Sequence, residues 1–161
     1  MGHTSGTAIR RATMKDFGPI EALLRDGGLM YAAGEKPCID SYFDRIYFED
    51  FLRKPEGHLC FVAEAGGEVV GAVLANYTQG YGQAFLDRVV VRADKRRMGI
   101  GHALNVRAMQ ECKNRGAGSV FTYINPGNAA SRAMLAGEGF KIAKGPHFLD
   151  TATRMMNPIP A

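Results

Sequence analysis

The sequence predicts an α+β domain built on a mixed sheet. Segments with strand-like and helix-like spacing of apolar residues follow one another in the order β-α-α-β-β-β-α-β-α-β-β. This order is neither a strict alternation of strands and helices nor a separate block of strands. The 161 residues contain no internal repeat and no Pro/Ser-rich linker, so one domain is expected over residues 1–161.

The first half of the chain predicts a strand, two helices and a hairpin. Residues 7–13 mix apolar and basic residues as an edge strand does, and residues 17–24 carry apolar residues at helical spacing. A second helix is expected over 40–53. The residues assigned to its core face are Phe43, Ile46, Tyr47 and Phe51. Two strand-like segments, 59–64 and 68–77, flank Gly66-Gly67, a strong signal for a hairpin turn.

The second half predicts a third long strand, two helices and a final hairpin. Residues 84–91 form that strand, interrupted by the polar pair Asp87-Arg88. A long helix is expected over 99–115, and a short one over 128–138 that ends at Gly139. The remaining strands are 119–124, 140–143 and 148–156, of which the last two can pair with each other.

Composition excludes several classes of protein. No apolar segment approaches the ~18–20 residues that a membrane-spanning helix needs. Cys38, Cys60 and Cys112 are odd in number and far apart, which argues against a disulfide framework and a thiolate metal site and favours a cytoplasmic location. The histidines lack ligand spacing, so no metal is expected. A net charge of +4 suits an anionic ligand without requiring nucleic acid.

Residues 85–101 carry the strongest functional signal. A strand leads into a basic loop with Gly99 and Gly101, and a helix begins there at once. The first turn of a helix leaves four N–H groups without partners, and its dipole favours an anion. A pyrophosphate is therefore the expected ligand. The charges expected around it are Arg92, Lys95, Arg96 and Arg97.

Two well-known phosphate-binding motifs do not fit this loop. The Gly-x-x-x-x-Gly-Lys-Ser/Thr pattern does not occur. A dinucleotide fingerprint requires a third Gly or Ala where this chain has Leu104, and it also requires a βαβ unit.

Two motifs resemble the GNAT superfamily of N-acetyltransferases. Arg96-x-x-Gly99-x-Gly101, between a strand and a helix, is similar to its central motif. The segment 128–135, followed by Gly139-Phe140, is similar to its second signature. The element order also matches over essentially the whole chain. The resemblance implies a mostly antiparallel sheet of six to seven strands flanked by about four helices, and acetyl transfer from acetyl-CoA to a primary amine.

The resemblance also implies how acetyl-CoA binds. Loop amides from Arg97 to His102 would hold its pyrophosphate, and the strand at 89–91 would bond its pantetheine arm as an added strand does. Asn128 would hold the pantetheine end, whereas Arg132 and the His102 side chain would contact the ligand or lie in solvent. The cofactor-binding residues so implied are Val89, Val90, Val91, Arg96, Arg97, Met98, Gly99, Ile100, Gly101, His102, Asn128 and Arg132.

The implied reaction is direct attack of a neutral amine on the thioester. Asp87 is the candidate base, because it lies two residues before Val89 and so is expected on the same face of the strand. Its alternative role is an ordinary ion pair. The amide of Val89 or Val90 would stabilise the thioester oxygen. Relatives often carry a Tyr seven residues after the Asn, where this chain has Leu135. Tyr123 is the candidate substitute acid, or else a half-buried aromatic residue.

The acceptor is expected between the first two helices and the final hairpin. Residues 27–31 with 34–35 would form one wall, and Glu35 and Asp40 would attract a cation or be surface charges. The aromatic residues near a turn, which line a slot or pack the hairpin, are Tyr77, Tyr81 and Phe85. A small-molecule amine is favoured over a peptide, and a homodimer through edge strands is possible. The alternatives are a non-catalytic acyl-CoA-binding module and, less favoured, a nucleic-acid-binding domain.

Overall fold

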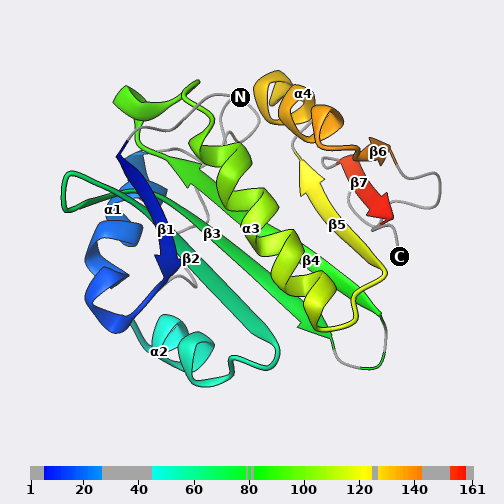
Figure 1. Cartoon of the computed structure of the whole chain (residues 1–161), viewed down its shortest axis with the longest axis horizontal. Coiled ribbons are helices and arrows are strands. Elements are labelled where there is room, and N and C mark those ends of the chain that lie inside the picture. The colour runs from blue at the N-terminus through cyan, green and yellow to red at the C-terminus, as the bar shows by residue number, and fades with distance from the viewer. Residues whose placement is uncertain are drawn as a thin grey trace.

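A mixed sheet organises the molecule (Figure 1). The computed structural model describes residues 6–26, 45–78, 80, 82–124, 127–142 and 153–158. Within them, seven strands form one sheet in the order β1-β2-β3-β4-β5-β7-β6. The pair β4–β5 is parallel and the other neighbours are antiparallel. The strands are β1 (Thr7–Arg11), β2 (His58–Ala65), β3 (Glu68–Thr78), β4 (Gln83–Val91), β5 (Ser119–Ile124), β6 (Lys141–Ile142) and β7 (Thr153–Pro158).

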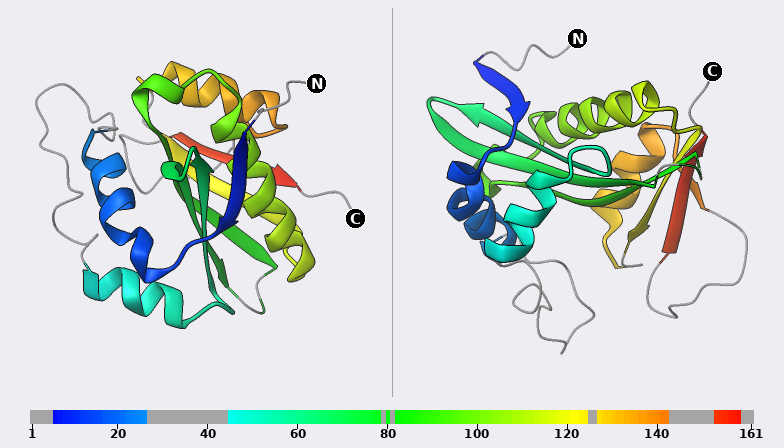
Figure 2. Two further views of the ribbon diagram at one scale, coloured as in Figure 1. Left: turned by 60° about the vertical axis from the view of Figure 1, so that its left-hand side comes forward. Right: turned by 90° about the horizontal axis from the view of Figure 1, so that it is seen from below.

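Helices cover both faces of this sheet. The α-helices are α1 (Phe17–Asp26), α2 (Arg45–Arg53), α3 (Ile100–Asn114) and α4 (Ala129–Gly137). Figure 2 shows α3 across one face, with α1 and α2 on the other. The predicted α+β class and element order are confirmed. Two short 3-10 turns, Met14–Asp16 and Ala93–Lys95, were not predicted.

The predicted hairpins and the predicted edge strand are confirmed. Gly66 and Gly67 both have positive φ, at 59° and 80°, as the tight turn between β2 and β3 requires. Among the described strands, β1 pairs only with β2 and lies at the edge of the sheet. The strand β7 pairs with β6, as predicted, and also inserts between β6 and β5.

The sheet separates two apolar cores. The core on the α3 side includes Phe61, Leu86 and Leu104, and the core on the α1/α2 side includes Ile20, Phe48 and Val90. All of these side chains are at most 8% exposed. The two-sided burial explains why β2 and β3 are apolar along most of their length.

The predicted core face of the second helix is wrong at one position. Ile46 is 80% exposed, whereas Phe48 is fully buried and Phe51 almost so. Phe48 and Phe51 are three residues apart and share a helix face, so their larger apolar area decides which face packs on the sheet. The expected residue Phe43 lies outside the described residues.

The close approach of α3 to β3 depends on Gly71. A Cβ atom there would lie 3.1 Å from Leu104 Cδ1, 3.2 Å from the Val90 carbonyl oxygen and 3.3 Å from Ile100 Cγ2. These distances leave no room for a branched side chain. The first turns of α3 are therefore fixed against the sheet by a residue without a side chain.

We expect Gly71→Val to lower the free energy of unfolding by about 1–3 kcal/mol, because its methyl groups overpack this contact. Thermal denaturation measures the effect. The control is Gly18→Ala on α1, where a Cβ atom meets nothing within 4 Å. A melting temperature of Gly71→Val equal to that of the wild type would show that the contact is not tight.

Candidate functional site

The strands β4 and β5 diverge in the middle of the sheet. They pair only from Gln83 to Phe85 and from Ser119 to Phe121, although β4 continues to Val91 and β5 to Ile124. The divergence toward α4 is visible in Figure 1. At the vertex, Thr122 Oγ1 donates a 2.7 Å hydrogen bond to the Leu86 carbonyl oxygen. Beyond that bond, β4 has a strand partner on its β3 side only, as far as the described residues extend.

A β-bulge lies at Asp87. Leu74 of β3 lies opposite Arg88, and the next residue, Ala75, lies opposite Leu86. Asp87, between Leu86 and Arg88, therefore has no partner in the register. Leu86 and Val89 both pack in the core on the α3 side, so Asp87 and Arg88 between them face the α1/α2 side. The expectation that Asp87 shares a face with Val89 is therefore wrong. The predicted interruption of the strand is this bulge rather than a break.

Asp87 lies in a partly desolvated position. Its side chain is 20% exposed, and Arg88 Nε lies 3.8 Å from its Oδ2. Burial raises the pKa of Asp87 above its ordinary value, while the Arg88 charge acts in the opposite direction. The result is a carboxyl group that holds a proton more firmly than one in water, next to the vertex of the split.

The loop that follows β4 presents a row of backbone N–H groups. Among the described residues, no N–H from Arg97 to His102 donates to a backbone carbonyl, and the first bond of α3 runs from the Ala103 N–H to the Gly99 carbonyl. Gly99 is the N-cap of α3 with φ of 79°, and Arg97 has φ of 62°. Such left-handed residues turn successive N–H groups toward one concave side, which suits an anion.

Two basic side chains of the loop already have partners within the protein. Arg92 forms ion pairs with Glu68 at 2.9 Å and with Asp94 at 2.7 Å. Arg96 Nε donates to the Val91 carbonyl oxygen at 3.0 Å. Arg97 and Met98 are exposed, whereas the Ile100 side chain is in the core. The predicted basic cluster is thus smaller than the sequence suggests, and the N–H groups without backbone acceptors are the main feature of the loop that suits an anion.

The helix α4 places the second motif beside α3. Asn128 is its N-cap, and the side-chain oxygen accepts from the Ser131 N–H at 3.1 Å. Met134 Sδ would lie 3.4 Å from a Cβ atom at Gly101, so Met134 faces α3. Leu135 is 3% exposed and belongs to the core. Its position therefore supplies neither a proton donor nor a polar surface.

A buried carboxylate joins the two helices. Glu138 has a side chain that is 2% exposed, and it accepts from Asn105 Nδ2 at 3.0 Å. His102 Nδ1 lies 3.1 Å from Glu138 Oε1. Burial raises the pKa of Glu138, against the lowering effect of these two hydrogen bonds. The His102 side chain is thus tied to α4, while it stays 60% exposed.

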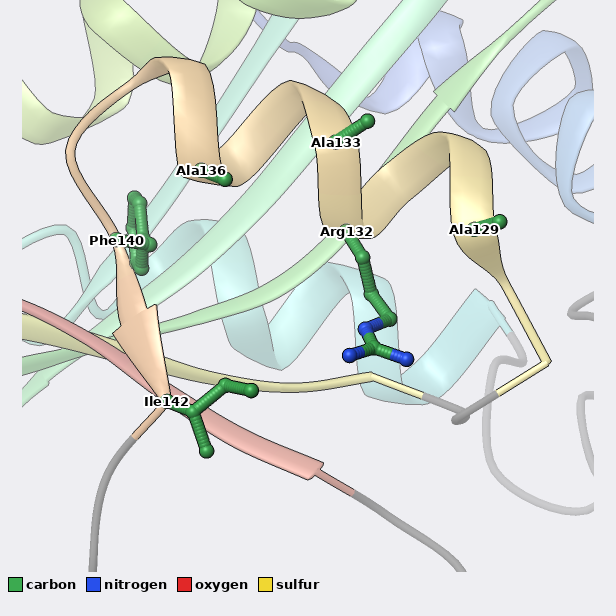
Figure 3. A pocket seen from close by; sticks show the side chains of 6 residues that line it. All are labelled: Ala129, Arg132, Ala133, Ala136, Phe140 and Ile142. Atoms are coloured by element: carbon green, nitrogen blue, oxygen red, sulfur yellow. The ribbon is translucent and has the colours of Figure 1, made fainter.

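A cavity of about 370 Å³ lies on the other side of α4 (Figure 3). Its lining residues are Ala129, Arg132, Ala133, Ala136, Phe140 and Ile142. Since Met134 and Glu138 face α3, Arg132 lies on a different face of α4 from the residues near the loop. The cavity does not include the loop or the split.

Three aromatic rings lie at the vertex of the split. Phe85 stacks on Phe121 with ring centroids 5.1 Å apart, and Tyr123 contacts both rings edge-on. Val120 and Ile124 pack in the core on the α3 side, so these rings face the α1/α2 side, like Asp87. Tyr77, in contrast, packs in the core on the α3 side.

Some predicted site residues lie outside the described part of the chain, and some residues near the site were missed. Residues 27–31 and 34–35, Asp40 and Tyr81 lie outside the described residues. Phe121, Asn105 and Glu138 were not predicted. The alternation of core residues over 119–124 would have placed Phe121 on the same face as Tyr123. No local pattern links Glu138 to Asn105, because the two residues lie 33 positions apart in the sequence.

The two described cysteines are buried core residues. Burial raises the pKa of Cys112 to about 11 and that of Cys60 to about 12. In the described part of the chain, no group of three His, Cys, Asp or Glu side chains is close enough to hold a metal ion. No helix among these residues has the length and apolar character needed to cross a membrane.

Comparisons with known proteins give a consistent result. Residues 27–140 match the Acetyltransferase (GNAT) family. The fold is similar to that of the PaiA N-acetyltransferase of Thermoplasma acidophilum in complex with coenzyme A, with a TM-score of 0.82 and 16% identity over 96% of this chain and 99% of that one. It is also similar to YncA of Salmonella typhimurium with acetyl-CoA, with a TM-score of 0.76 and 20% identity over 97% and 95% of the two chains.

A third similar structure is the ribosomal-protein-alanine N-acetyltransferase of Brucella melitensis. It has a TM-score of 0.74 and 24% identity over 94% of this chain and 99% of that one. A search of curated proteins found no match.

We expect Glu138→Gln to flatten the dependence of stability on pH. Because the pKa of Glu138 is raised in the folded state, its protonation stabilises the fold at pH values below its ordinary pKa of 4.5. This stabilisation is lost as pH rises through the folded-state pKa. The glutamine keeps an acceptor for Asn105 without a charge, so the variant should be at least as stable as the wild type at pH 7. Denaturant unfolding between pH 4 and 8 measures this, with the exposed Glu56→Gln as control. A parallel pH dependence in Glu138→Gln and the wild type would contradict it.

Proposed function

Because this chain belongs to the acetyltransferase (GNAT) family, we propose that it transfers the acetyl group of acetyl-CoA to a primary amine. One observation carries the proposal: β4 is bordered by the split and ends in the loop whose N–H groups have no backbone acceptor among the described residues. A diphosphate and an extended arm joined to it would bind to these two adjacent features. The complexes of two similar proteins with coenzyme A and acetyl-CoA support the same substrate.

The residues fit this substrate on physical grounds. Amides from Arg97 to His102 would bind the pyrophosphate, aided by the exposed Arg97. The side of β4 at Val89–Val91 that has no partner among the described strands offers alternating N–H and C=O groups to an amide-containing arm, as in strand addition. Asn128 uses its oxygen as a helix cap, which leaves its NH₂ group to donate to the ligand. Arg132 is a weaker candidate, because it lies at the cavity of α4.

The proposed chemistry begins with removal of a proton from the acceptor ammonium. Asp87 lies on the α1/α2 side of the split, and its raised pKa makes it a stronger base than an ordinary aspartate. The neutral amine then attacks the thioester carbonyl carbon, and the N–H of Val89 or Val90 would stabilise the oxygen. The C–S bond breaks and the coenzyme A thiolate leaves.

Tyr123 is the proposed proton donor to that thiolate. Phe85 and Phe121 are the last pair before the split, and Asp87 and Tyr123 each lie two residues beyond them. The candidate base and the candidate acid therefore flank the split at matching positions. Leu135 is buried in the core and cannot take this role.

The nucleic-acid-binding alternative is less well supported than acetyl transfer. Arg92 is already paired with Glu68 and Asp94, which removes charge from the basic segment that a nucleic-acid-binding domain would use. A non-catalytic acyl-CoA-binding module would bind coenzyme A but release no thiol with any amine.

We expect Gly99→Val to weaken coenzyme A binding by about 10- to 100-fold. A β-branched residue is strained at φ of 79°, so the loop must rearrange and its N–H groups no longer converge. Isothermal titration calorimetry with coenzyme A measures the affinity. The control is Gly80→Val in the turn before β4, where the glycine also has positive φ and open space around it. Equal affinities in Gly99→Val and the wild type would refute the assignment of the loop.

We expect Asp87→Asn to lower kcat for thiol release by about 100-fold, with little change in the KM for acetyl-CoA, because the amide cannot accept the proton. The lower limb of the pH–rate profile should disappear. The exposed Asp50→Asn on α2 serves as control. An unaltered pH profile would exclude Asp87 as the base, and a wild-type rate for Tyr123→Phe in the same assay would exclude Tyr123 as the acid.

A further inference from the structure

The rings of Phe85, Phe121 and Tyr123 form a continuous aromatic surface, here called the aromatic floor. The centroid distances are 5.1 Å between Phe85 and Phe121, 5.9 Å between Phe85 and Tyr123, and 6.0 Å between Phe121 and Tyr123. Phe85 and Phe121 are half-buried, and Tyr123 is 42% exposed. Ring edges and faces at such spacing favour another aromatic ring placed against them.

The aromatic floor is continuous with the proposed reaction centre. It lies on the α1/α2 side of the sheet, as Asp87 does, and opposite to the face on which α3 packs. Phe85 precedes Asp87 by two residues, which is about 7 Å along a strand. A ligand that covers the aromatic floor therefore has one end beside the carboxylate and the split.

The chemistry of the aromatic floor and of Asp87 restricts the chemical class of the acceptor amine. A carboxylate attracts an ammonium group, and aromatic rings attract both a cation and an apolar body. An amino acid would place its carboxylate against the three rings, with no polar partner from them except the Tyr123 hydroxyl. A polyamine, a single flexible chain, would cover little of their apolar area. A flat ring on a short alkyl amine would match both the rings and the carboxylate.

We propose that the acceptor is an arylalkylamine, a primary amine joined by a short carbon chain to an aromatic ring. Its ring packs on Phe85, Phe121 and Tyr123, and its nitrogen lies at Asp87, facing the thioester across the split. The inference rests on the proposed acetyl transfer and names the substrate class of the same site. Tyr123 thus both contacts the acceptor ring and borders the split.

The protein contains no tryptophan, which permits a direct binding test. Tryptamine carries an indole ring, so its fluorescence reports binding without a background from protein tryptophan. We expect a blue shift of its emission when protein saturated with coenzyme A is added. Phe85→Leu and Phe121→Leu should each weaken tryptamine binding by about 5- to 10-fold and leave the coenzyme A affinity unchanged. Tyr77→Leu, on the opposite side of the sheet, is the matched control and should bind tryptamine as the wild type does.

A thiol-release assay with acetyl-CoA provides the second measurement. Tryptamine and phenethylamine should have a kcat/KM at least about 10-fold above that of spermidine, of free amino acids and of a short peptide. Phe85→Leu should raise the KM for tryptamine but not that for acetyl-CoA.

The outcomes separate this inference from the proposed function. Absence of heat with coenzyme A would refute the acetyl-CoA site itself. Normal coenzyme A binding without a tryptamine shift, or with equal tryptamine affinity in Phe85→Leu and the wild type, would refute the arylalkylamine acceptor alone. Preferred acetylation of spermidine or of the peptide would also refute it, while leaving acetyl transfer in place.

Discussion

The divergence of β4 from β5 is the constraint on which the rest of the site depends. Parallel pairing stops after Phe85 and Phe121, and the Thr122 hydroxyl satisfies the Leu86 carbonyl at the vertex. Beyond this point one edge of β4 lies in the middle of the sheet without a partner among the described strands. Backbone N–H and C=O groups require partners when they are desolvated, so such an edge suits an extended ligand with amide groups of its own.

The bulge at Asp87 couples this opening to the chemistry. By inserting one residue, it moves Val89 to the α3 side and places Arg88 on the same side as Asp87. The proposed substrate contacts are thereby divided between two faces of one strand. The loop amides and α4 lie where α3 begins, whereas the carboxylate and the aromatic floor lie on the opposite face. A group placed in the split has access to both.

The core holds this arrangement in place. Gly71 lets α3 approach β3 within contact distance of Leu104 and Ile100, which fixes the first turn of α3 and therefore the direction of the loop N–H groups. Glu138 ties α4 to the same turn through Asn105 and His102. The loop proposed to bind the pyrophosphate is thus supported by packing below it and by a buried hydrogen-bond network beside it.

The sequence by itself determined the element order, the hairpin at Gly66-Gly67, and the glycine loop at the start of α3, because these depend on local spacing and on backbone conformations that few residues adopt. The tertiary structure decided that Asp87 and Val89 lie on opposite faces, and that Phe48 is buried in place of Ile46. It also decided the pairing of Arg92 with Glu68 and Asp94, and the contacts of Phe85 with Phe121 and Tyr123. Each of these depends on contacts between neighbouring strands or packed elements. A shift of one residue in register reverses the direction of every following side chain, and local sequence does not fix where that shift occurs.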